Sequence, residues 1–152
     1  MPIESPITVR VQRAYTHSPE RVFDAWLDPA LLGRWMFGPS IRDEEIVRLS
    51  VDARVGGKFS FVVRRQGTEI DHVGEYLEID RPTRLVFTWG TADNLPETSR
   101  VTIDIAPRDG GCDLTLTHDM DAKWADYAAR TEAGWRKMLE ALERVWSVEW
   151  VG

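Results

Sequence analysis

From residue 44 onward the chain is a succession of short stretches rich in β-branched and aromatic residues. Turn signals separate them: Val55-Gly56-Gly57, Gln66-Gly67, Arg81-Pro82 and Arg108-Asp109-Gly110-Gly111. Glycine reaches positive φ without strain, and parallel strands need a crossover of about a dozen residues, for which there is no room here. These stretches, together with the alternating segment 7–15, predict seven strands in one antiparallel sheet.

Two short helices are expected between the first and second strands. Ser18-Pro19 supplies an N-cap followed by a first helical residue with a preset φ, and Asp28-Pro29 repeats the device ten residues later. Gly38-Pro39 then ends the second helix. The stretch at the end of this helix, LLGRWMFGP (31–39), has five large apolar side chains within its first seven positions. It is either an ordinary buried helix end or one wall of a pocket.

The last 30 residues change to the helical period. Apolar residues recur at i, i+3, i+4 and i+7 from Trp124 to Trp146, which predicts a helix of about 25 residues with one dry side. Such a helix would be roughly 37 Å long, enough to cross a seven-stranded sheet. Gly134 interrupts the stripe and suggests close backbone approach or a bend. The predicted class is α+β, with the sheet curved around this helix.

Length, charge and cysteine content narrow the class of protein. A chain of 152 residues fits a single domain spanning 1–152. The net charge of −6 is spread along the chain without a basic block, which disfavours nucleic-acid binding. No segment resembles a signal peptide or a membrane span, so a soluble, cytoplasmic protein without membrane insertion is expected. One cysteine, Cys112, excludes an internal disulfide.

The order of elements and several motifs resemble one known family. The pieces that carry the resemblance are SPERVFDAWLDPALLGRWMFGP (18–39), VGGKFSF (55–61), GEYLEIDRPTRLVFTW (74–89) and AGWRKMLEALERV (133–145). Together they are similar to the activator of Hsp90 ATPase homologue 1-like family, within the START-like, Bet v 1-like SRPBCC superfamily. This resemblance covers nearly the whole chain and implies a helix-grip fold. In relatives, the space between helix and sheet often holds an apolar ligand.

Seven tryptophans in so small a chain indicate either an aromatic core or a pocket for an apolar molecule. For any single ring the core is the simpler interpretation. As a set they favour a pocket, because Val, Ile and Leu would suffice to pack one helix on a sheet. The predicted ligand-binding residues are Trp35, Phe37, Phe59, Phe61, Tyr76, Trp89, His118, Trp124, Trp135, Met138 and Leu139.

No catalytic, cofactor or metal site is predicted from the polar residues. His118 precedes Asp119 and His72 follows Asp71, but adjacent strand residues point to opposite faces, so neither pair can enter one site without a bulge. Cys112 has no nearby histidine in sequence and is expected to be a bystander thiol.

Three classes of function remain open. The first is a binding module for a small apolar or amphipathic molecule. The second is a cyclase- or hydrolase-type enzyme, in which His118 or Tyr76 would move protons. The third, a partner of a chaperone ATPase, rests on the family name alone and ranks last. A homodimer would use an apolar patch at Trp146 and Trp150, although a core role for Trp146 explains that residue equally well.

Overall fold

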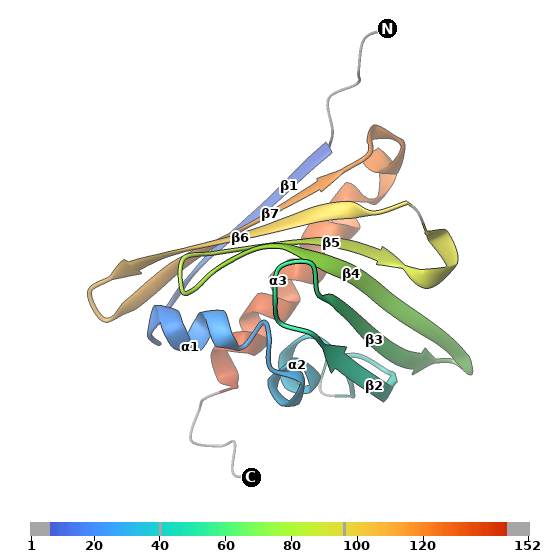
Figure 1. Cartoon of the computed structure of the whole chain (residues 1–152), viewed down its shortest axis with the longest axis horizontal. Coiled ribbons are helices and arrows are strands. Elements are labelled where there is room, and N and C mark those ends of the chain that lie inside the picture. Colours follow the sequence, from blue (N-terminus) through green and yellow to red (C-terminus); the bar gives the residue numbers. More distant parts are fainter. Residues whose placement is uncertain (1–6, 40, 96, 146–152) are drawn as a thin grey trace, which may run out of the picture.

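The computed structural model describes residues 7–39, 41–95 and 97–145 (Figure 1). The strands are β1 (Ile7–Tyr15), β2 (Glu45–Val51), β3 (Lys58–Arg65), β4 (Thr68–Asp80), β5 (Arg84–Thr91), β6 (Ser99–Arg108) and β7 (Gly111–Met120). The helices are α1 (Pro19–Asp24), α2 (Pro29–Trp35) and α3 (Ala128–Arg144), with 3₁₀ turns η1 (Ala92–Asn94) and η2 (Ala122–Tyr127). Of these helices, none is long and apolar enough to cross a lipid bilayer.

The seven strands form one sheet in the order β1-β7-β6-β5-β4-β3-β2, and every pair is antiparallel. Figure 1 shows this sheet bending over α3, with α1 and α2 on the same side near the C-terminal end of that helix. The predicted α+β helix-grip class, with seven antiparallel strands and two short helices after the first, is therefore confirmed.

Strand β4 carries one of the two bulges in the sheet's described pairings; the other is in β2. The register with β5 shifts between Tyr76 and Glu78, and such bulges bend a strand and increase its twist. Two residues earlier, a Cβ on Gly74 would lie 1.9 Å from the carbonyl oxygen of Thr88, so only glycine allows the backbones to approach this closely.

The short helices begin as their capping residues predict. The Ser18 hydroxyl accepts a hydrogen bond from the Arg21 amide at 3.2 Å, and the Asp28 carboxylate accepts one from the Ala30 amide at 3.0 Å. A proline occupies the first turn of each helix. Both helices bury their apolar faces, and α2 packs against α3. They close one end of the space under the sheet.

The long helix is shorter than its sequence period suggests. Its first part, η2, is a 3₁₀ turn, and the α-helix proper has 17 residues. In a 3₁₀ turn residues i and i+3 eclipse each other, which places Trp124 and Tyr127 side by side with ring centroids 5.5 Å apart. Along α3 the stripe facing the sheet is buried, and the hydroxyl of Tyr15 donates to the Leu139 carbonyl at 2.8 Å.

Large aromatic side chains fill much of the interior. Trp35 is fully buried, and its indole N–H donates to the Ala25 carbonyl at 3.1 Å. Four indoles contact one another in series: ring centroids are 4.6 Å apart for Trp35 and Trp26, 6.0 Å for Trp26 and Trp135, and 5.7 Å for Trp135 and Trp89. This indole series runs from α2, through the core, to Trp135 in the middle of α3 and Trp89 on β5.

A buried ionic cluster fixes the chain after α2. The Glu44 carboxylate accepts hydrogen bonds from the Gly38 amide at 2.8 Å, from Arg42 at 3.1 Å and from Arg65 at 2.6 Å, and its side chain is fully buried. Burial alone would raise the pKa of Glu44, but these three donors outweigh it and the pKa is lowered. Gly38 has φ of +103°, a conformation that a side chain would strain.

Candidate functional site

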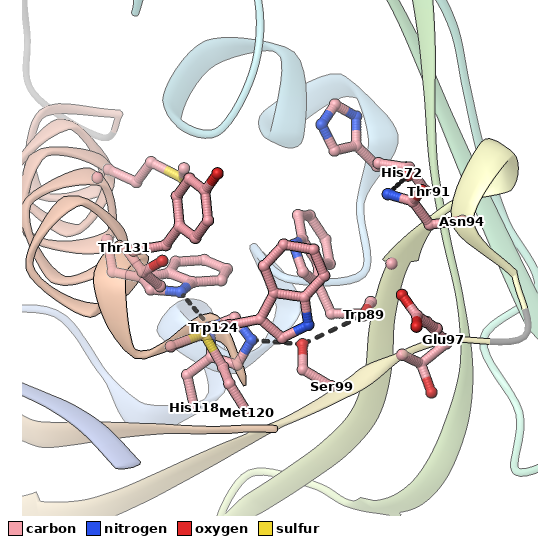
Figure 2. A pocket seen from close by; sticks show the side chains of 16 residues that line it. His72, Trp89, Thr91, Asn94, Glu97, Ser99, His118, Met120, Trp124 and Thr131 are labelled. Atoms are coloured by element: carbon pink, nitrogen blue, oxygen red, sulfur yellow. Dashed lines mark hydrogen bonds between the residues drawn. The ribbon is translucent and has the colours of Figure 1, made fainter. Parts of the chain in front are cut away.

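A pocket of about 360 Å³ lies between the first half of α3 and the sheet. Its aromatic lining consists of Trp89, Trp124, Tyr127, Trp135 and two histidines, His72 and His118. Two methionines, Met120 and Met138, complete its apolar surface. Figure 2 shows the labelled lining residues converging from strands β4 to β7 and from α3.

Gly134 creates part of this space. A Cβ at this position would meet no heavy atom within 4 Å, and the residue lies on the pocket wall between Thr131 and Met138. The sequence suggested close backbone approach or a bend here, whereas the structure shows open room. A side chain on Gly134 would therefore enter the pocket instead of clashing with the backbone.

His118 belongs to a complete hydrogen-bond network at the pocket floor (Figure 2). The indole N–H of Trp135 donates to Nδ1 of His118 at 3.0 Å, and an indole nitrogen can only donate. Nδ1 must therefore be an acceptor, which places the proton of the neutral ring on Nε2. Nε2–H then donates to the Ser99 hydroxyl at 2.6 Å, and that hydroxyl donates to the Trp89 carbonyl at 3.2 Å.

The direction of this network determines its chemistry. A general base must accept the proton of a serine hydroxyl, but here the imidazole donates to Ser99. Burial lowers the pKa of His118 to about 4, and nearby Asp119 offsets this only in part, so the ring is neutral at pH 7. Ser99 and His118 thus form a structural pair that positions Trp135, and they do not form an activated nucleophile.

His72, on β4, is bonded at one nitrogen only within the described residues. Its Nδ1 lies 3.2 Å from the Phe61 carbonyl oxygen, which can only accept, so Nδ1 carries the proton and Nε2 carries the lone pair. The ring is held between Phe37 and Trp89, with centroids 4.9 and 5.6 Å away. Burial is the main cause of the lowered pKa of His72, and the positive charges of Arg65 and Arg42 lower it further. The hydrogen bond to the Phe61 carbonyl and the negative charge of Glu44 act in the opposite direction.

The mouth of the pocket is polar. Lys123 forms an ion pair with Glu97 across it, joining η2 to the segment before β6, and the Lys123 ammonium lies 5.6 Å from the Trp124 ring centroid. The amide of Asn94 donates to the Thr91 hydroxyl at 3.1 Å on the other side. These groups are mostly exposed, so the pocket opens to solvent at this end and is dry at its floor.

The predicted ligand-binding residues divide into two groups. Five of them line the pocket: Trp89, His118, Trp124, Trp135 and Met138. The other six lie in the core outside its lining: Trp35, Phe37, Phe59, Phe61, Tyr76 and Leu139. Among these, Phe59 and Phe61 stack on each other at 4.6 Å, and burial raises the pKa of the Tyr76 phenol. The LLGRWMFGP segment is therefore a buried helix end, and its rings do not line this pocket.

Other lining residues were not predicted as ligand-binding. They include His72, Met120, Tyr127 and the rim residues Thr91, Asn94 and Glu97. Met120 could have been found, since it shares strand parity with His118. The rim residues carry no such signal, because Thr91 is the last residue of β5, Asn94 lies in η1 and Glu97 lies in the connection to β6. The proposed dimer residues Trp146 and Trp150 fall outside the described part of the chain.

Within the described residues, no group of three His, Cys, Asp or Glu side chains could hold a metal ion. Cys112 is fully buried in β7, and burial raises the pKa of its thiol. The alternation of β7 separates His118 from Asp119, whose carboxylate accepts a hydrogen bond from the exposed Thr8 hydroxyl at 2.8 Å on the other face. Neither pair of neighbouring histidine and aspartate forms a joint site.

A curved antiparallel sheet that grips a long C-terminal helix over an aromatic pocket defines a helix-grip domain of the SRPBCC type. Residues 16–147 match the family model described as Activator of Hsp90 ATPase homolog 1-like protein. The chain belongs to this family. None of the curated proteins matches it significantly.

Solved structures agree with this assignment. Protein CV1439 from Chromobacterium violaceum is 30% identical, with a TM-score of 0.78 over 91% of this chain and 95% of that one. An AHSA1-like protein from Aeromonas hydrophila is 24% identical, with a TM-score of 0.74 over 91% of both chains. SA2116 from Staphylococcus aureus, a protein of unknown function, is 19% identical with a TM-score of 0.81 over 92% and 93%. The last two show likeness of fold alone.

Proposed function

We propose that this protein binds one small apolar or amphipathic molecule in the pocket between α3 and the sheet. The observation that carries the proposal is a space of about 360 Å³ whose walls are mainly indole, phenol and thioether surface. This volume lies at the lower end of the range typical of ligand pockets, about 300–1,000 Å³, and suits a molecule of one or two rings.

The combination of a dry floor and a polar mouth favours an amphipathic guest over a purely apolar one. Trp135 and His118 at the floor are almost fully buried, whereas Asn94 and Glu97 at the mouth are exposed. The apolar body of a ligand gains most by lying against the indoles, since burial of apolar surface contributes about 25 cal/mol per Å². Met138 adapts to irregular shapes because its side chain is flexible.

Enzymatic turnover is the second candidate function, and the short contact between Ser99 and His118 is the observation that favours it. The direction of the hydrogen bonds argues against turnover, since His118 donates a hydrogen bond to Ser99 through Nε2–H and accepts one from Trp135 at Nδ1. Tyr76, the other sequence candidate, is buried in the core outside the pocket lining. A binding role therefore accounts for more of the geometry.

The test uses the neutral fluorescent probe N-phenyl-1-naphthylamine. We expect the wild-type protein to bind it and enhance its emission, and Gly134→Leu to weaken binding at least about tenfold by filling the space into which a Cβ already points. Ala133→Leu is the matched control, because it places the same leucine side chain on the exposed neighbour in the same helix. Equal probe binding by both variants, with both folded by circular dichroism, would contradict the pocket assignment.

A further inference from the structure

No positively charged side chain of the described residues lines the inside of the pocket. Among its described lining residues there is no lysine or arginine, and the only carboxylate is Glu97 at the mouth. The floor donors are already used, because Trp135 donates to His118, His118 to Ser99, and Ser99 to the Trp89 carbonyl. An incoming carboxylate would thus find no charged donor within the lining.

Among the described lining residues, His72 is a buried side chain with an unused hydrogen-bond acceptor. It is about nine-tenths buried, lines the pocket, and donates its one N–H to the Phe61 carbonyl of the neighbouring strand. That bond directs Nδ1 toward β3, so Nε2 is the ring nitrogen left for the pocket. Within the described residues Nε2 has no hydrogen-bond partner. A ligand that displaces water from this acceptor must supply a donor in its place, because an acceptor left unpaired in an apolar pocket costs free energy.

The surroundings of His72 keep this lone pair available. Phe37 and Trp89 pack on the ring and hold its orientation. The charged groups that act on it are Arg42, Arg65 and Glu44, two cations against one anion, and together with burial they disfavour an imidazolium. The imidazole therefore faces a ligand as a fixed, neutral acceptor.

We propose that the ligand is a flat apolar molecule bearing a hydroxyl or amine N–H, which donates to Nε2 of His72, and that the pocket rejects molecules ending in a carboxylate. This inference rests on the pocket function proposed above and adds the chemistry of the ligand. A carboxylate would place its oxygens against the Nε2 lone pair, and the Lys123 ammonium at the mouth is already paired with Glu97. Its binding would improve once His72 took up a proton.

A series with one ring system and three substituents tests the proposal. The compounds 2-naphthylmethanol, 2-methylnaphthalene and 2-naphthoate are compared at pH 7.5 by displacement of N-phenyl-1-naphthylamine. One hydrogen bond to a buried acceptor predicts that the alcohol binds about fivefold more tightly than the hydrocarbon. The carboxylate is expected to bind at least about tenfold more weakly than the alcohol, and to gain affinity at acidic pH as His72 is protonated, where the alcohol does not.

Two variants assign the preference to His72. His72→Phe keeps an aromatic ring but removes the acceptor, so it should bind the hydrocarbon as before and lose the preference for the alcohol. His72→Gln retains an acceptor and should keep part of that preference, which guards against a folding defect in the first variant. Both are measured alongside wild type with the same probe.

The outcomes separate this inference from the proposed function. If all three compounds displace the probe equally from wild type, or if His72→Phe retains the preference for the alcohol, the role of His72 is overturned while the pocket function stands. If neither the probe nor any naphthalene binds, the pocket function itself is overturned, and the ligand chemistry with it.

Discussion

Replacing His118 by glutamine should flatten the acid side of the pH–stability curve. In the folded protein, burial lowers the pKa of His118 from 6.5 to about 4, while in the unfolded chain it returns to the ordinary value. As the pH falls below 6.5 the unfolded state takes up a proton that the folded state refuses. The stability contributed by the neutral ring is therefore complete above about pH 6.5 and is lost as the pH approaches 4.

The magnitude follows from these two pKa values. Each pH unit between them changes the free energy of unfolding by about 1.4 kcal/mol. Between pH 7.5 and 4.5 this one group should cost the wild-type protein about 2.5 kcal/mol. His118 is only 4% exposed, so solvent screening does not reduce the value appreciably. Protonation at Nδ1 would also set two donors, His118 and Trp135, against each other.

The assay is reversible urea unfolding, followed by far-UV circular dichroism at half-unit steps from pH 7.5 to 4.5. His118→Gln should be less stable than wild type at pH 7.5, because the network is broken, but should lose about 2.5 kcal/mol less across the range. Carboxylates and His72 titrate in both proteins and cancel in the difference. Ser99→Ala is the control: it removes the two hydrogen bonds of the Ser99 hydroxyl, to His118 and to the Trp89 carbonyl, but keeps the buried imidazole, and should retain the wild-type slope. Parallel curves for wild type and His118→Gln would refute the neutral, buried state assigned to this ring.

Four further changes are expected to alter the free energy of unfolding at pH 7.5, measured by the same urea titration. Gly134→Ala should raise it by about 1 kcal/mol, since the new methyl meets open space in a helix interior. Gly74→Ala should lower it by about 3 kcal/mol, because the methyl would overlap the Thr88 carbonyl, and an unchanged value would show that β4 relaxes freely. Tyr15→Phe should cost about 1 kcal/mol through the lost hydrogen bond to α3, and no cost would mean that water replaces it. Glu44→Gln should cost about 2 kcal/mol by depriving the partly exposed guanidinium groups of Arg42 and Arg65 of the buried carboxylate they share, and a stabilised variant would overturn that account.

The sheet could be predicted from the sequence because its information is local. From β2 to β7 each turn connects neighbouring strands, so turn residues such as Gly110-Gly111 and alternation along each strand define their order and direction. The pairing of β1 with β7, at the other end of the chain, has no such local signal. The helix stripe was equally local, and Trp135 and Leu139 do face the sheet. The exception was η2, where a 3₁₀ turn replaces the start of the expected helix.

The division of aromatic residues between core and pocket could not be predicted in the same way. Phe59 and Trp89 both point inward, yet Phe59 lies in the core and Trp89 lines the pocket. Strand parity gives the same answer for both, and the distinction depends on where β4 curves and where Gly134 leaves space. The role of His72 likewise depends on a carbonyl eleven residues away on another strand, which no local pattern reveals.

The indole series has a consequence for spectroscopy. Excitation energy migrates readily between chromophores in van der Waals contact. The series links Trp89 and Trp135 at the pocket to Trp26 and to Trp35, the last residue of α2. A ligand that quenches Trp89 would therefore also reduce the fluorescence of the other three indoles by energy transfer. The intrinsic tryptophan emission would then report occupancy of the pocket without any added dye.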